Sequence, residues 1–179
     1  MSTKEKPIAT PKKGTAAGFR TERDVARGRF TDIKVHNKTK MKVYRFVQIV
    51  TGIRSYSREK VLGCVKKGLK YSAITQLKAA LHTSQKETAQ ILSIPTSTLQ
   101  RRKKAGRLKT DESDRVVRLA SIKDAAVAMM QEDDEAAVAW LHTPLDILGG
   151  ESPLQHASTE LGAKDVEDLI GRLRHGVFS

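Results

Sequence analysis

The 179-residue sequence has little aromatic character and almost no cysteine. Aromatic residues make up 4% of the chain, so a core must depend on leucine, isoleucine, valine and alanine. The single cysteine, Cys64, excludes an internal disulfide framework and a cysteine-rich metal site. No apolar run reaches the length of about 18 residues that a membrane span needs, and the basic N-terminus lacks the apolar segment of a secretory signal. We therefore expect a cytoplasmic protein that does not enter a membrane.

The residue patterns that mark catalytic and metal sites are also missing. The five histidines, at positions 36, 82, 142, 156 and 175, show no paired ligand spacing. No glycine-rich phosphate loop follows a strand-like segment, and the acidic residues 132–135 form one contiguous run rather than two converging carboxylates. We expect a protein that is not an enzyme and that has no catalytic residues, no metal and no cofactor.

The net charge of +13 is distributed very unevenly along the chain. Residues 1–70 carry 19 basic and 5 acidic side chains, and residues 71–110 carry 8 basic and 1 acidic. Residues 111–179 carry 6 basic and 14 acidic side chains. A basic front half suits a polyanion and an acidic rear suits a protein, so the charge pattern predicts two different partners.

The apolar pattern predicts an all-α protein in three parts. Residues 1–40 are basic and show little apolar periodicity, which predicts a disordered tail that could lie against DNA phosphates. The alternatives are a dispensable tail or a true start at Met41. Residues 41–109 are predicted to form a helical DNA-binding region, and residues 110–179 an acidic helical C-terminal domain.

Capping and breaking residues suggest where the helices begin and end. Residues 42–53 fit either a strand or a helix, whereas Ser57 begins a helix with Val61, Leu62 and Val65 inward and Gly68 as its stop. A helix over 153–161 is predicted to stop at Gly162. The other predicted helices span residues 71–81, 110–130, 134–141 and 164–175.

The stretch from Ser84 to Lys109 has the pattern of a helix-turn-helix, with the motif itself over 84–105. Ser84 and Glu87 can form a capping box, and Ala89 is small enough for a close crossing of two helices. Pro95 breaks the first helix, while Ile94 and Leu99 can fill the corner. Since Ser93 stands where such motifs usually have glycine, we expect a distorted turn.

The second helix of this motif is predicted to meet DNA. Thr96 is the expected cap, and arginine and glutamine side chains can pair with guanine and adenine at two points. An ordinary helical hairpin with a solvated basic face is the alternative. The predicted DNA-binding residues are Thr96, Ser97, Gln100, Arg101, Arg102 and Lys104.

A family resemblance appears in the C-terminal part of the chain and extends upstream from it. Its motifs are Trp140-Leu141 before Pro144, Leu148-Gly149-Gly150 before Ser152-Pro153-Leu154, Thr159-Glu160-x-Gly162 and Arg172-x-x-His175-Gly176-Val177. Upstream stand Leu99-Gln100-Arg101-Arg102, Gly106-Arg107-Leu108 and Glu112-Ser113-Asp114-Arg115. With these motifs in order over about residues 57–179, the chain resembles antitoxins of the Xre/MbcA/ParS family.

The resemblance implies a type II antitoxin. Such proteins cover the active site of a RES-domain toxin, which consumes NAD, with the C-terminal domain, and bind their own promoter DNA, usually as homodimers. Acidic side chains on the last helix suit an electropositive cleft, and basic ones near the chain end could enter it. The residues implied in toxin binding are Glu160, Arg172, Arg174 and His175, each of which could instead be plain exposed surface. A transcriptional regulator without a toxin partner and a non-specific nucleic-acid-binding protein are the alternative functions.

Overall fold

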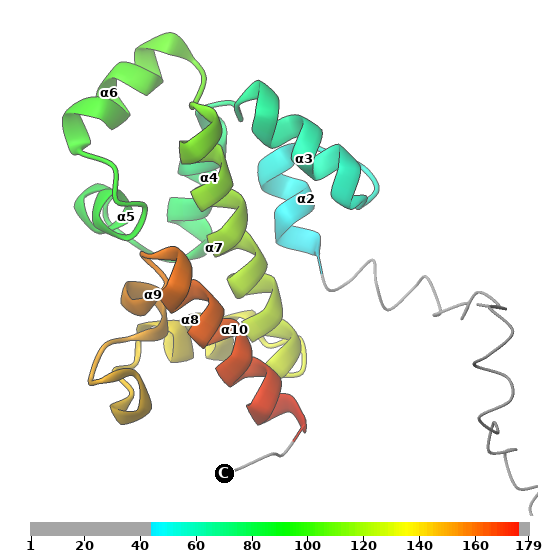
Figure 1. The fold of residues 1–179 in the computed structure, drawn as a ribbon, viewed down its shortest axis with the longest axis vertical. Helices are drawn as coiled ribbons and strands as arrows, with labels where there is room; N and C mark the ends of the chain where they lie inside the picture. Colours follow the sequence, from blue (N-terminus) through cyan, green and yellow to red (C-terminus); the bar gives the residue numbers. More distant parts are fainter. Residues whose placement is uncertain (1–43, 176–179) are drawn as a thin grey trace, which may run out of the picture. The chain divides into compact units, whose positions relative to one another are not determined.

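The computed structural model describes residues 44–175, which are almost entirely helical (Figure 1). The all-α prediction is confirmed for this part of the chain, whereas the predicted tail over 1–40 lies outside it. No helix within residues 44–175 is long and apolar enough to cross a membrane. The helices are α2 (Arg45–Thr51), α3 (Arg58–Lys67), α4 (Ser72–Ala80), α5 (Gln85–Ile91), α6 (Thr96–Ala105), α7 (Thr110–Met129), α8 (Asp134–His142), the 3-10 helix η2 (Asp146–Leu148), α9 (Pro153–His156) and α10 (Glu160–His175).

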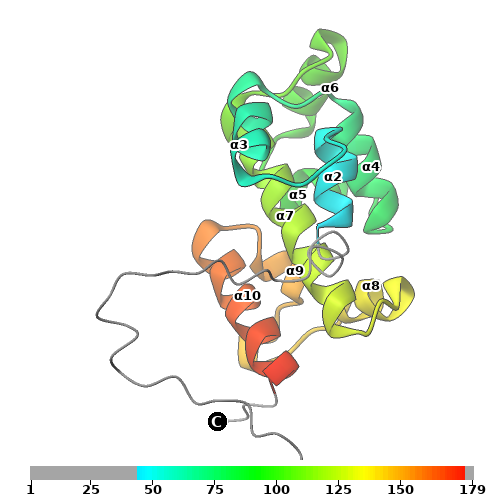
Figure 2. The same ribbon diagram turned by 90° about the vertical axis from the view of Figure 1, so that its right-hand side faces the viewer.

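The 20-residue helix α7 is the element against which five other helices pack (Figures 1 and 2). It contacts α2, α3 and α4 from the first half of the chain and α8 and α10 from the second. Its buried positions include Val116, Leu119, Ile122 and Ala126, which belong to one continuous core built mainly from aliphatic side chains. A domain boundary at residue 110 stays a prediction, since the helix that starts there packs against helices of both parts.

Residues 45–51, whose pattern fits a strand or a helix, form helix α2. Phe46, Val47 and Val50 are buried on its inner face. The Asp124 carboxylate of α7 accepts the backbone N–H groups of Phe46, at 2.8 Å, and Val47, at 2.9 Å. Burial raises the pKa of Asp124 to about 6, against the opposing effect of these hydrogen bonds. The first turn of α2 is therefore capped by a side chain far away in the sequence.

Helix α3 follows its prediction except at one position. Val61 and Val65 are buried, but Leu62 is 51% exposed, so its predicted burial is wrong. One residue corresponds to about 100° of rotation around a helix, which turns Leu62 away from the side that Val61 faces. Gly68 ends the helix with φ +78°, as predicted.

The role predicted for Gly162 is wrong. Helix α9 already ends at His156, and Gly162 lies in the first turn of α10, which begins at Glu160. A Cβ atom on Gly162 would lie only 2.0 Å from the carbonyl oxygen of His156. Glycine is therefore needed at this position because α10 passes so close to the end of α9.

Candidate functional site

Helices α5 and α6 form the helix-turn-helix expected from the sequence. The capping box is present, since the Ser84 N–H donates to Glu87 Oε2 at 2.6 Å and the Glu87 N–H donates to Ser84 Oγ at 3.2 Å. Ala89, Ile94 and Leu99 are all buried where the two helices meet. The local pattern therefore predicted this motif and its small core correctly.

The turn between α5 and α6 is held in place by a residue of α7. Ser93 has φ +50°, the left-handed conformation that glycine adopts most easily. The serine therefore takes the backbone conformation of the usual glycine, in place of the distorted turn that we expected. Arg115 Nη1 donates to the carbonyl oxygens of Leu92, at 3.0 Å, and Ser93, at 2.9 Å. The predicted cap is wrong, because α6 begins at Thr96 after Pro95 and no side chain caps it.

Five of the six predicted DNA-binding residues are exposed on one side of α6. The spacing of these positions places them opposite the buried Leu99. Short hydroxyl side chains lie at the start of the helix and long basic ones toward its end, where Gly106 stops it with φ +74°. The five exposed residues are Thr96, Ser97, Gln100, Arg101 and Lys104.

Arg102, the sixth, binds another part of the protein. Its Nε lies 2.9 and 2.8 Å from the two carboxylate oxygens of Glu112, and the two side chains are 12% and 6% exposed. Glu112 also accepts the backbone N–H of Lys109 at 2.8 Å. Arg102 therefore ties α6 to the first turn of α7, and we assign it to positioning the helix rather than to reading bases.

The C-terminal part has a charged cluster where α9 meets α10. His156 Nδ1 lies 2.7 Å from Glu151 and Nε2 lies 3.3 Å from Asp165. The hydrogen bond to Glu151, followed by that to Asp165, raises the pKa of His156. Sequence reasoning did not find this cluster, because its members are separated along the chain and have no motif of their own.

The predicted toxin-contact residues lie along α10. Glu160, Arg172 and Arg174 are exposed, and His175 ends the helix with its side chain outside the described part. The structure adds two apolar side chains that sequence reasoning missed, Leu161 at 72% exposure and Ile147 at 60%. Contiguous apolar patches mark protein interfaces, whereas single exposed apolar side chains are common, so exposure alone assigns these two no partner.

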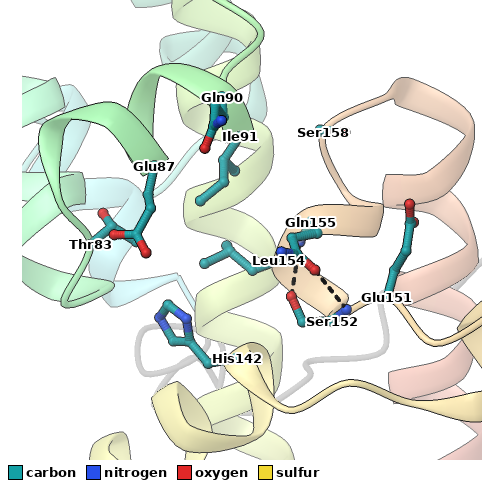
Figure 3. Close-up of a pocket in the computed structure, with 10 residues that line it drawn as sticks. All are labelled: Thr83, Glu87, Gln90, Ile91, His142, Glu151, Ser152, Leu154, Gln155 and Ser158. Atoms are coloured by element: carbon teal, nitrogen blue, oxygen red, sulfur yellow. Dashed lines mark hydrogen bonds between the residues drawn. The ribbon is translucent and has the colours of Figure 1, made fainter.

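A polar groove of about 500 Å³ lies between the helix-turn-helix and the C-terminal helices (Figure 3). Glu87 and Gln90 of α5 line one side, and Ser152 and Gln155 line the other. His142 also lines the groove, and its Nε2 lies 2.8 Å from the carbonyl oxygen of Leu81. The two parts of the protein are thus joined by direct hydrogen bonds as well as by α7.

Comparison with known proteins assigns a domain type to each part. Residues 65–121 match the antitoxin Xre-like helix-turn-helix domain, and residues 125–176 match the antitoxin Xre/MbcA/ParS C-terminal toxin-binding domain. Antitoxin Xre of Yersinia enterocolitica is 38% identical over 116 residues, which are 64% of this chain and 78% of that protein. Antitoxin Xre of Photorhabdus laumondii is 39% identical over 74 residues, 41% of this chain and 50% of that protein. The Prs ADP-ribosylating antitoxin of a Sphingobium species is 29% identical over 127 residues, 66% of this chain and 80% of that protein.

Proposed function

The chain belongs to the Xre family of antitoxins, and from this premise we propose that it neutralises a RES-domain toxin and represses its own operon. The C-terminal domain covers the active site of the toxin, and the helix-turn-helix binds promoter DNA. We propose a homodimer that acts in the cytoplasm, because two copies of a helix-turn-helix can bind two half-sites of one operator.

The toxin class is supported by chemistry and by charge. One relative is named as a Prs ADP-ribosylating antitoxin, and an ADP-ribosylating toxin draws on NAD, as RES toxins do. A cleft that binds this anionic dinucleotide must be electropositive. Residues 111–179, with 14 acidic and 6 basic side chains, complement such a cleft.

The observation that carries the proposal is the exposed surface of the matched toxin-binding domain. Leu161, at 72% exposure, lies on α10 directly after the exposed Glu160. Interfaces commonly surround an apolar anchor with polar and charged groups. We propose that Leu161 is such an anchor, with Glu160, Arg172 and Arg174 contributing charged contacts along the same helix.

The DNA-binding half of the proposal depends on the exposed side of α6. Arg101 is exposed on the second helix, where a side chain of its length can reach base edges, and Lys104 lies one turn further on. Thr96 and Ser97, at the start of the helix, can contact base edges or phosphates. Arg102 supports this side through its bond to Glu112.

The proposal predicts an open reading frame for a RES-domain toxin beside this gene, and co-expression with that toxin tests neutralisation. Leu161→Glu places a second carboxylate beside Glu160 at the proposed anchor, and we expect loss of neutralisation with promoter binding unchanged. The matched control is Leu62→Glu, which alters an exposed leucine of α3, outside the toxin-binding domain, and should still neutralise. Growth arrest with wild-type antitoxin, or full protection by Leu161→Glu, would contradict the proposal.

The reciprocal variant is Arg101→Ala. We expect it to weaken promoter binding by about 1–3 kcal/mol and to relax sequence choice, while neutralisation is retained. Fluorescence anisotropy with promoter and scrambled duplexes measures both quantities. An equal loss on every sequence would make Arg101 a phosphate contact instead.

A further inference from the structure

We propose that a second basic surface, outside the recognition helix α6, binds the phosphate backbone of the bound DNA. We call it the basic ridge. This proposal rests on the proposed DNA binding, and it names further residues that would fix the position of α6 on the duplex. The ridge consists of Lys66, Lys67, Lys70, Arg107 and Lys109.

The fold brings the ridge together from two segments that are distant in sequence. The Leu108 N–H donates to the Leu69 carbonyl and the Tyr71 N–H donates to the Gly106 carbonyl, both at 2.9 Å. An isolated antiparallel β-bridge pairs Lys70 with Arg107. Residues 66–70 therefore lie beside residues 106–109, and Figure 1 shows the end of α3 next to the connection between α6 and α7.

Gly68 permits this close approach. A Cβ atom there would lie 2.2 Å from the carbonyl oxygen of Leu108. The backbone also has φ +78°, which L side chains rarely adopt. Backbone contacts therefore hold the lysines of residues 66–70 close to Lys109, and their own flexible side chains are not needed for this.

The ridge combines exposed positive charge with a recess for an anion. All five of its side chains are exposed, and Lys66, Lys67 and Lys109 line a recess of about 380 Å³. The acidic side chain on this recess, Asp111, lies 3.3 Å from Arg115 and is partly neutralised by it. The excess positive charge suits a phosphate group.

Helix stabilisation explains only part of this cluster. Lys66 and Lys67 lie in the last turn of α3, where positive charge stabilises a helix. Arg107 Nη1 donates to the Gly68 carbonyl at 2.8 Å. Lys109, however, directly precedes α7, and a cation is unfavourable at a helix N-terminus. A negatively charged ligand would offset this unfavourable interaction of Lys109 with the N-terminus of α7.

The ridge is continuous along the chain with the recognition helix. Residues 106–109 follow α6 directly, so the ridge extends the positive charge of Arg101 and Lys104 beyond the end of the helix. Contacts to phosphates set the register of a protein on DNA without reading sequence. The ridge therefore contributes affinity and orientation, while the exposed side of α6 contributes specificity.

The test compares full-length K66Q/K67Q/K109Q with the wild type on promoter and scrambled duplexes across a salt series. The slope of log affinity against log salt is negative, and each lost phosphate contact reduces its magnitude by about 0.9, so we expect the magnitude to fall by about 2.7. The affinity loss should be the same for both duplexes, leaving their ratio unchanged. The charge-matched control K60Q/K78Q/K164Q alters exposed lysines outside the ridge and should change the slope by less than one phosphate contact.

Two further measurements distinguish loss of the basic ridge from loss of folding and from failure of the proposed repression. K66R/K67R/K109R retains the charges and should retain the salt slope, and thermal unfolding shows whether each variant is folded. A folded ridge variant whose slope has the wild-type magnitude, or a magnitude no smaller than that of the control, would overturn the basic ridge. Failure of the wild type to prefer promoter over scrambled DNA would instead overturn the proposed repression.

Discussion

Helix α10 contains two glycines for which the same substitution should have opposite effects. Gly162 lies in its first turn and Gly171 near its end, and neither has the positive φ that would make any side chain strained. A Cβ on Gly162 would lie 2.0 Å from the His156 carbonyl oxygen and 3.0 Å from Thr159 Oγ1. A Cβ on Gly171 would meet nothing within 4 Å.

The magnitudes follow from helix propensity and from packing. Alanine is favoured over glycine inside a helix by about 1 kcal/mol, so Gly171→Ala should raise the free energy of unfolding by about that amount. Gly162→Ala gains the same term, but α10 must move away from a backbone carbonyl that cannot rotate aside. Overpacking of this kind costs about 3 kcal/mol at the upper end of its usual range, which leaves a net loss of about 2 kcal/mol.

Urea unfolding of the two variants and the wild type measures this difference, which should be about 3 kcal/mol between Gly162→Ala and Gly171→Ala. Since the displacement separates α10 from α9, Gly162→Ala should also weaken toxin neutralisation, whereas Gly171→Ala should not. A Gly162→Ala variant as stable as Gly171→Ala would refute the reasoning, because it would mean that the approach of α10 to His156 is not close.

Two other substitutions test the turn and the charged cluster. Ser93→Gly removes the backbone strain of a serine at φ +50° and should raise the free energy of unfolding by about 1 kcal/mol. The control Ser97→Gly, within α6, should lower the free energy of unfolding. A Ser93→Gly variant less stable than the wild type would contradict this reasoning. The raised pKa of His156 means that its protonated form stabilises the fold, fully below the ordinary histidine pKa and less as pH rises through the raised value. The stability advantage of wild type over His156→Gln, followed by thermal unfolding from about pH 5 to about pH 9, should therefore shrink with rising pH; an advantage that grows would be inconsistent with the bonds to Glu151 and Asp165.

The features that could be read from the chain alone are those whose cause is local. The capping box of Ser84 and Glu87, the break at Pro95 and the inward Leu99 lie within one short stretch, and backbone geometry and side-chain periodicity act over that range. Composition likewise predicts the helical class, and the charge count predicts a basic and an acidic half. None of these depends on where distant segments meet.

Tertiary structure decided the features that depend on a partner elsewhere in the chain. Residues 45–51 are helical and capped because Asp124 reaches their first N–H groups, and Arg102 is turned to Glu112 rather than to the exposed side of α6. Gly162 is required by the His156 carbonyl, not as a helix stop. The basic ridge exists because residues 66–70 and 106–109 pair. Sequence patterns specify what each segment favours, whereas packing around α7 specifies which segments touch, and only the latter places these groups together.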